Sequence, residues 1–293
     1  MEYSTEKMYP IDAVVLAGKS KLNVDCKLET EKNIPTDYKS IVKLNGRPIV
    51  NYVMERLAES VYIKDIYVVG EKDKLDNIDF VKGKEKINFV DDQGSLLDNL
   101  VEGGNKAKTK KILFSMSDIP LIKTKDVDSF IQECLIKWDG SIYITYCTKK
   151  LNHQNLKENY PAKLKGEHLR NGSILMLDED LLNVLKSKGE LYNTVKGLYG
   201  KRKKGLWPYF KLKEYVPIKV LPLYAINLIF NNLGVNRLER LISNRATESI
   251  KKETGKNHNF NFYGIESPCE FADDVDSVKD LIKFEEHLKE TLI

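Results

Sequence analysis

An apolar stretch that stops abruptly at polar residues is the feature that most constrains this chain. Residues 111–116 follow Lys110, begin with Lys111, are mostly apolar, and are followed shortly by Asp118, Ile119 and Pro120. Proline cannot pair inside a sheet, so the stretch predicts a buried strand that ends just before Asp118. Open α/β sheets bind ligands at the carboxyl ends of their strands, where a carboxylate is a suitable ligand for Mg2+. The alternative is that Asp118 caps a helix that begins near Thr124.

Two further apolar runs have the same character, and each ends at a glycine. Residues 11–17 precede Gly18, and residues 65–70 end at Gly70. A strand that leads into glycine is typical of many nucleotide-binding loops, because the missing Cβ lets backbone N–H groups approach phosphate oxygens. The spacing of a P-loop is absent, so a plain turn is the alternative. Residues 19–38 are polar and predict a long loop.

The composition is that of an ordinary soluble protein. The 293 residues include 42% hydrophobic residues, enough to bury a large core, and the formal net charge is +4. A charge this small does not indicate a partner made of nucleic acid. The four cysteines and four histidines lack the spacing of a disulfide framework or a zinc site. The N-terminal residues lack a signal peptide's apolar core, and we expect a cytoplasmic protein.

Six segments, taken in order, resemble the landmarks of one enzyme family. They are residues 14–18, 39–48, 66–70, 94–99, 117–121 and the acidic segment 272–281. Their order and spacing resemble the nucleotidyltransferases related to molybdenum-cofactor guanylyltransferase. The resemblance implies an α/β fold of the GT-A or Rossmann-like type, with a mostly parallel mixed sheet flanked by helices. It also implies Mg2+-dependent transfer of a nucleoside monophosphate from a nucleoside triphosphate to a phosphorylated small-molecule acceptor, with release of pyrophosphate.

The resemblance assigns roles to single residues. The nucleotide-binding residues would be Leu16, Ala17, Gly18, Lys19, Lys39, Gly94, Ser95 and Asp118. Lys39 and Asp118 would be catalytic, while Asp118, Asp274 and Asp276 would bind Mg2+. Asn171 and Gly172, which we predict at a tight turn, would contact the acceptor. Such groups suit the chemistry, since a metal, a lysine and oriented amides neutralise charge on the α-phosphate and on departing pyrophosphate.

The acidic segment near the C-terminus has a second interpretation. Ser277 and Asp280 match a capping box that precedes an apolar helical pattern, and acidic residues favour a helix N-terminus. Asp274 and Asp276 could therefore belong to a helix start. The two interpretations are compatible, because one carboxylate from this segment is enough for a metal.

We expect one nucleotidyltransferase domain over residues 1–293, organised in four parts. They are a nucleotide-binding half (1–150), acceptor-side strands (151–195), a helical and basic insertion (196–255), and a closing strand and helix with the metal segment (256–293). Between Lys196 and Lys213, seven cations occur without an acid and alternate with aromatic residues. This basic segment could bind the acceptor or an anionic surface, and a solvated loop is the alternative.

Two other functions stay open from the sequence. Asp274 and Asp276 also spell the Asp-x-Asp pattern of GT-A glycosyltransferases that use a nucleotide sugar, although in that family the pattern follows the central strand. Lys19 stands where the nucleotidyltransferases usually have a second glycine, which is compatible with a catalytically weakened nucleotide-binding or regulatory protein. Release of pyrophosphate would separate an enzyme from such a protein.

Overall fold

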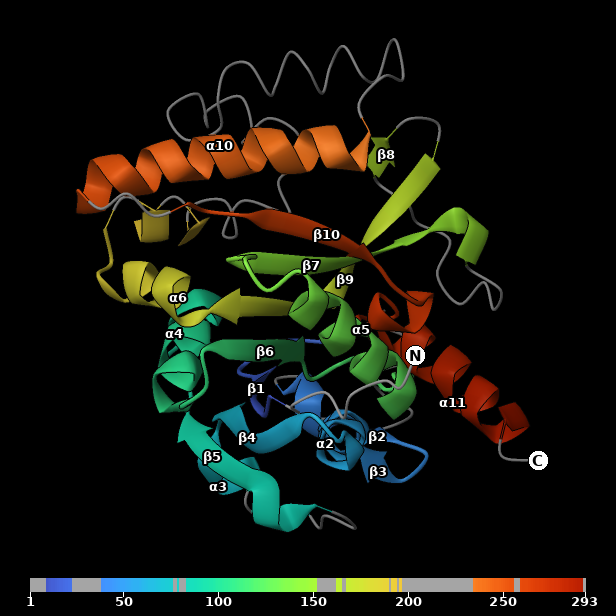
Figure 1. Cartoon of the computed structure of the whole chain (residues 1–293). Coiled ribbons are helices and arrows are strands. Elements are labelled where there is room, and N and C mark those ends of the chain that lie inside the picture. The colour runs from blue at the N-terminus through green and yellow to red at the C-terminus, as the bar shows by residue number, and fades with distance from the viewer. Residues whose placement is uncertain are drawn as a thin grey trace, which may run out of the picture. The chain divides into compact units, whose positions relative to one another are not determined.

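Four parallel strands form one sheet from the apolar runs in the first part of the chain (Figure 1). In spatial order they are β6 (Lys111–Met116), β1 (Ile11–Ala17), β4 (Ile63–Gly70) and β5 (Ile87–Asp91). Every residue of β1 is buried. Continuous apolar strands are expected here, because helices cover both faces of a parallel sheet. The predicted α/β class is therefore confirmed.

The computed structural model describes part of the chain and divides it into two units. The described residues are 9–22, 38–75, 78, 83–151, 162–164, 167–189, 191–193, 195–196, 234–255 and 259–291. The first unit is Met1–Ile136 with Asp273–Ile293, and the second is Lys137–Ala272. The four parts predicted within a single domain, with limits at residues 150, 195 and 255, stay a prediction.

Helices and one pair of short strands connect the four strands of the first unit. The short strands are β2 (Lys43–Leu44) and β3 (Arg47–Pro48), which pair with each other. The helices are η1 (Lys39–Ile41), α2 (Ile49–Glu59), α3 (Lys72–Leu75), η2 (Lys84–Lys86), α4 (Leu96–Lys106) and α5 (Thr124–Ile136). In α2 the apolar positions at helical spacing, Val50, Val53, Met54 and Leu57, are all fully buried. Helix α4 packs on β1 and β4. Gly103 allows this packing to be close, since a Cβ at that position would collide with Val14.

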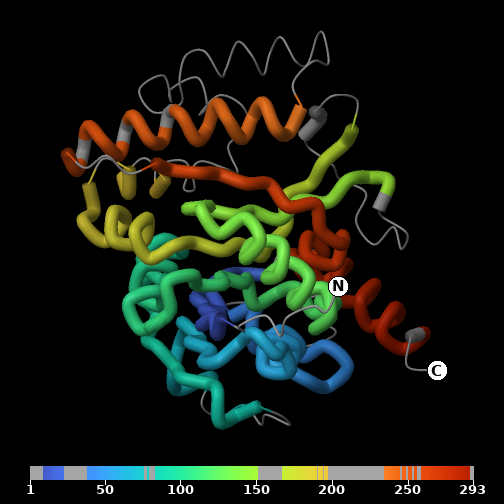
Figure 2. Tube along the Cα trace, viewed as in Figure 1, coloured from blue at the N-terminus to red at the C-terminus, as the bar shows by residue number. Residues whose placement is uncertain are grey.

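The C-terminal segment belongs to the first unit and ends in α11 (Val278–Thr291), drawn in red in Figure 2. The predicted capping box is confirmed: the N–H of Asp280 donates to Ser277 Oγ at 3.2 Å, and the N–H of Ser277 donates to Asp280 Oδ2 at 2.9 Å. Helix α11 contacts β2. The cap hydrogen bonds and the contact of α11 with β2 together hold the segment that precedes α11 in place.

Strand β7 (Ile142–Thr148) is the centre of the sheet in the second unit. It pairs with β10 (Phe262–Glu266) in parallel and with β9 (Glu167–Asp178) in antiparallel orientation, and β8 (Ala162–Leu164) pairs with β9. The other described elements are η3 (Lys149–Leu151), α6 (Glu179–Lys186), α10 (Val235–Thr254) and η6 (Cys269–Phe271).

Helix α10 is bonded to the outer edge of β10 by three side chains spaced four residues apart. Glu239 Oε1 accepts a hydrogen bond from the N–H of Gly264 at 2.7 Å. Ser243 Oγ accepts one from the N–H of Phe262 at 2.9 Å, and Thr247 Oγ1 accepts one from the N–H of Phe260 at 2.9 Å. The spacing matches, since four helical residues rise about 6.0 Å and two strand residues about 6.6 Å. Within the predicted insertion, residues Val235–Thr254 are helical.

The tight turn predicted at Asn171 and Gly172 is wrong, because both residues lie inside β9. Asn171 pairs with Tyr146, next to a register irregularity between Ile144 and Tyr146. A Cβ on Gly172 would collide with Thr145 Oγ1. This glycine therefore serves a close approach between two strands and not a change of chain direction.

Much of the predicted insertion lies outside the described residues. This part includes the basic segment from residue 197 to 213 and extends to residue 233. At the start of the basic segment, Lys196 Nζ donates to the hydroxyl of Tyr192 at 3.0 Å. Among the helices of the described ranges, none combines the length and apolar character needed to cross a membrane.

Candidate functional site

The carboxyl ends of the four parallel strands of the first unit lie in register at one edge. Ala17 pairs with Gly70, Gly70 with Asp91, and Leu16 with Met116. The residues that follow these positions are therefore brought together although they are distant in sequence. This is the edge at which open α/β sheets bind ligands.

Asp118 follows β6 at this edge, as predicted, and is only 5% exposed. Its backbone carbonyl accepts the N–H of Val275 at 2.9 Å, and Val275 is fully buried. This hydrogen bond and the buried valine hold the segment before α11 against the loop after β6. The prediction that Asp118 caps the helix at Thr124 has no support, because its carboxylate pairs elsewhere.

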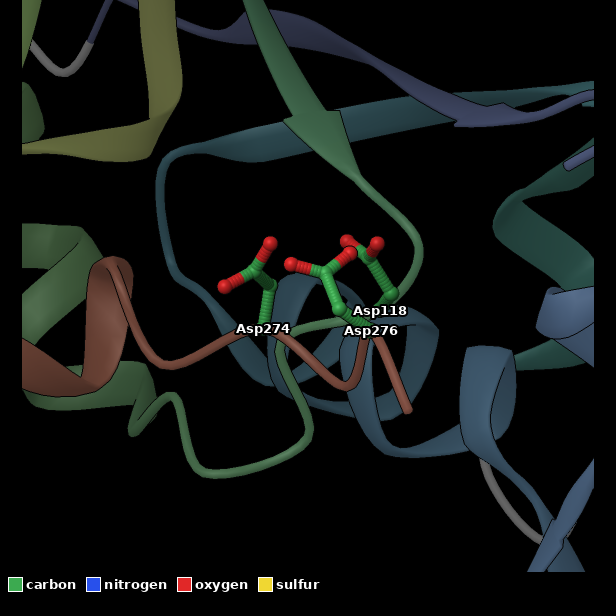
Figure 3. Close-up of side chains that lie close together, drawn as sticks. All are labelled: Asp118, Asp274 and Asp276. Carbon is green, nitrogen blue, oxygen red and sulfur yellow. The ribbon is translucent and has the colours of Figure 1, made fainter. Parts of the chain in front are cut away.

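Asp274 and Asp276 flank Val275 and bring two further carboxylates to Asp118 (Figure 3). One oxygen from each of the three side chains lies within 4.8 Å of the other two. Figure 3 shows the three side chains close together, Asp118 from the loop after β6 and the others from the segment before α11. The structure therefore brings together all three residues that were predicted to bind Mg2+.

The amine of Lys39 lies among these carboxylates. It forms an ion pair with Asp118 Oδ2 and donates to Asp276 Oδ1 at 2.9 Å, and its side chain is 7% exposed. Burial alone would lower the pKa of Lys39, but the charges of Asp118 and Asp276 outweigh burial and raise that pKa above its usual value. Lys39 is therefore protonated throughout the physiological range. The sequence did not indicate this pairing.

The donor set fits Mg2+. Asp118 Oδ1 is buried and has no hydrogen-bond partner among the described residues, although a buried unsatisfied oxygen is costly. Carboxylate oxygens are the ligands that Mg2+ prefers, at about 2.0–2.1 Å, so that opposite ligands lie about 4.1 Å apart. Three octahedral ligands include at least two adjacent pairs, about 2.9 Å apart, so the side chains, whose oxygens lie within 4.8 Å of one another, would turn toward the ion to bind it.

The loop after β1 is closely packed on the residues that follow β5. A Cβ on Gly18 would collide with Asn99 Nδ2 and lie 3.2 Å from Asp92 Oδ1. The N–H of Lys19 donates to Asp92 Oδ2 at 3.0 Å. Gly18 therefore lies where the loop after β1 meets the side chains of Asp92 and Asn99. Leu16 and Ala17, also predicted to contact nucleotide, are buried at the end of β1.

Asp92 is a site residue that the sequence analysis missed. It accepts hydrogen bonds from Lys19 N–H at 3.0 Å, Gly94 N–H at 2.8 Å and Asn99 Nδ2 at 2.9 Å. Burial alone would raise the pKa of Asp92, but these hydrogen bonds outweigh it and lower that pKa. Asp92 follows a strand at its carboxyl end, so the rule that identified Asp118 could have found it.

Gly94 and Ser95 form the entry to α4. Gly94 has φ +80°, in the left-handed region that favours glycine. Ser95 is the N-cap, and its Oγ accepts the N–H of Asp98 at 3.2 Å. The predicted acceptor residues Asn171 and Gly172 belong to the second unit, and their role stays a prediction.

Comparisons with known proteins agree with this architecture. Residues 35–167 match the sequence model of the MobA-like NTP transferase domain. A hypothetical transferase from Thermus thermophilus superimposes with a TM-score of 0.64 at 22% identity, covering 93% of this chain and 99% of that chain. A nucleotidyl transferase from Methanothermobacter gives a TM-score of 0.51 at 14% identity, covering 96% and 99%.

A third solved structure is a CMP:2-keto-3-deoxy-manno-octonic acid synthetase complexed with CTP. Its TM-score is 0.50 at 12% identity, and the alignment covers 97% of this chain and 99% of that chain. Likeness at such identities shows the fold alone. The search of curated proteins gave no match.

Proposed function

We propose that this chain, whose residues 35–167 match the MobA-like NTP transferase domain, is a nucleotidyltransferase that transfers a nucleoside monophosphate to a phosphorylated small-molecule acceptor with release of pyrophosphate. The observation that carries the proposal is the cluster of Asp118, Asp274 and Asp276, in which Asp118 and Asp276 bond the amine of Lys39. It lies at the carboxyl edge of the parallel sheet, beside the loop that contains Gly18. A metal-bound triphosphate requires carboxylates for the metal, and a lysine and a loop for its phosphates.

The proposed roles of the chain's residues follow from the charges of the reaction. Asp118, Asp274 and Asp276 would hold Mg2+, which, when bound, neutralises charge on the α-phosphate and on the leaving pyrophosphate. Lys39 would donate to phosphate oxygens through its amine. The loop that begins at Gly18 would wrap the triphosphate, and the N–H of Lys19 in that loop is donated to Asp92.

The transfer itself is an in-line substitution at phosphorus. A phosphate oxygen of the acceptor attacks the α-phosphorus, one P–O bond forms, and the P–O bond to pyrophosphate breaks. No covalent intermediate with the chain is needed, so positioning and electrostatics supply the catalysis. The proposed products are a nucleotide-linked acceptor and pyrophosphate.

The acceptor needs a binding surface of its own. We propose that Asn171, Gly172 and the basic segment between Lys196 and Lys213 contact the acceptor. The cations of this segment suit a phosphorylated molecule, and a synthetase complexed with CTP among the similar folds is consistent with a nucleotide donor. An anionic surface is the other partner that this segment would attract.

The test is a direct assay of pyrophosphate. The full chain is incubated with Mg2+, each of the four NTPs and pools of phosphorylated acceptors, and pyrophosphate release is measured. Asp118→Asn should abolish release, whereas Asp180→Asn, an exposed aspartate in α6, should not change it. Acceptor-dependent release of a nucleoside diphosphate from nucleotide sugars, without pyrophosphate from any NTP, would instead support a glycosyltransferase.

A further inference from the structure

Lys39 and a divalent metal would compete for the same carboxylates. The amine is bonded to Asp118 Oδ2 and lies 2.9 Å from Asp276 Oδ1. A dication bound by these two side chains would lie close to the ammonium, and like charges at short range repel each other. The structure thus places one positive charge on two of the carboxylates that a metal would use.

The charge balance of the cluster shows what Lys39 contributes. Three carboxylates carry three negative charges, and Lys39 reduces the sum to two. Asp118 is the most buried of the three, and removing its cation would leave a buried charge uncompensated. Lys39 therefore stabilises the arrangement of acids in the fold, in the way that a metal would.

Lys39 is also attached to the loop on which a triphosphate would bind. Its backbone N–H donates to the carbonyl of Ser20 at 2.9 Å, two residues after Gly18, and Tyr38 forms a bridge with Ser20. The lysine side chain has four flexible methylenes. Its amine can therefore turn from the carboxylates to phosphate oxygens while the backbone stays in place.

We infer that Lys39 is an exchangeable counter-ion, which holds the metal-binding carboxylates until a triphosphate draws its amine away, so that the metal and the nucleotide enter the site together. The inference rests on the proposed function, because it takes the triphosphate as the ligand that moves Lys39. It assigns to Lys39 a second role besides contact with phosphate. The role predicts that Lys39 opposes metal binding when nucleotide is absent.

The test is a titration of the full chain with Mn2+, followed by the EPR signal of the free ion. Without nucleotide, Lys39→Met should bind Mn2+ about tenfold or more tightly than wild type, since one repelling charge near the ion is removed. A matched control is Lys43→Met, which removes the same charge from an exposed position four residues on and should bind like wild type. In wild type, a non-hydrolysable NTP should tighten Mn2+ binding.

Two further measurements keep the test decisive. Adding Asp118→Asn to Lys39→Met should abolish the gain in affinity. Because Lys39→Met leaves Asp118 without its partner, the variant should have a lower Tm, and Mn2+ should raise that Tm more than it raises the Tm of wild type. If the variant does not fold alone, Lys39→Gln is titrated in its place, since glutamine can still donate to Asp118.

The outcomes separate the inference from the proposed function. Equal or weaker Mn2+ binding by Lys39→Met and Lys39→Gln overturns the counter-ion role, even if wild type releases pyrophosphate. Tighter Mn2+ binding by these variants supports the role, even if no NTP is turned over, in which case only the proposed function fails.

Discussion

Removal of the Asp92 carboxylate should loosen the contact between the loops after β1 and β5. Asp92→Ala deletes the acceptor of three hydrogen bonds, from Lys19, Gly94 and Asn99. Lys19 and Gly94 are exposed, so water can replace Asp92 as the partner of their N–H groups. Asn99 is 3% exposed, so its amide would lose a partner that water does not readily replace.

The magnitude follows from this difference in exposure. A hydrogen bond to a charged group contributes about 1.5–3 kcal/mol, and the loss at the buried Asn99 should dominate, so we expect a fall of about 2 kcal/mol in the free energy of unfolding. Urea denaturation at neutral pH measures it as a shift of the midpoint. Asp91→Ala is the control, because Asp91 is exposed and its substitution should cost less than about 0.5 kcal/mol. Equal midpoints for the two variants would refute the reasoning.

The same comparison has a predictable pH dependence. The pKa of Asp92 is lowered in the folded chain, so its stabilising effect is fully present above the pKa of the unfolded chain and is lost as the pH falls through the lowered value. The stability difference between wild type and Asp92→Ala should therefore be constant near neutrality and shrink only in acid. A difference that stays constant into strong acid would exclude this assignment.

Three further outcomes are expected. Lys39→Ala should weaken NTP binding by about tenfold or more in a calorimetric titration, while Lys43→Ala should leave it unchanged; equal affinities would contradict the phosphate role. Gly172→Ala should lower the free energy of unfolding by about 1–3 kcal/mol because its Cβ collides with Thr145, and an unchanged urea midpoint would exclude this collision. Replacing Lys201, Arg202, Lys203 and Lys204 together with serine should raise the acceptor KM severalfold and leave NTP affinity unchanged. A large loss of NTP affinity in this variant would place these cations over the nucleotide.

The strands and the position of Asp118 could be predicted because the sequence alone carries the relevant signals. Apolar runs such as residues 11–17 are buried on both faces, and a proline after Asp118 marks the end of β6. The same logic extends to Asp92, which follows β5. The signal was present there, but an acidic pair before a glycine also suits an ordinary turn.

The pairing of Lys39 with the acids could not be predicted from the sequence. Lys39 and Asp276 are 237 residues apart, and only the folded chain shows that their side chains meet. The error at Gly172 has a different cause, since Asn-Gly favours a turn when judged locally, whereas here the glycine is required by Thr145 on the neighbouring strand. Both features depend on contacts that no local pattern encodes.

The ladder of hydrogen bonds between α10 and β10 also has a consequence for solubility. A sheet edge with open N–H groups is a template for another chain. Glu239 and Ser243 occupy two such groups in β10, and Thr247 occupies that of Phe260 just before the strand. The helix thus acts as a cover that prevents growth of the sheet by addition of strands from other molecules. A variant shortened by removal of α10 should therefore self-associate as its concentration rises, even where its remaining strands are correctly folded.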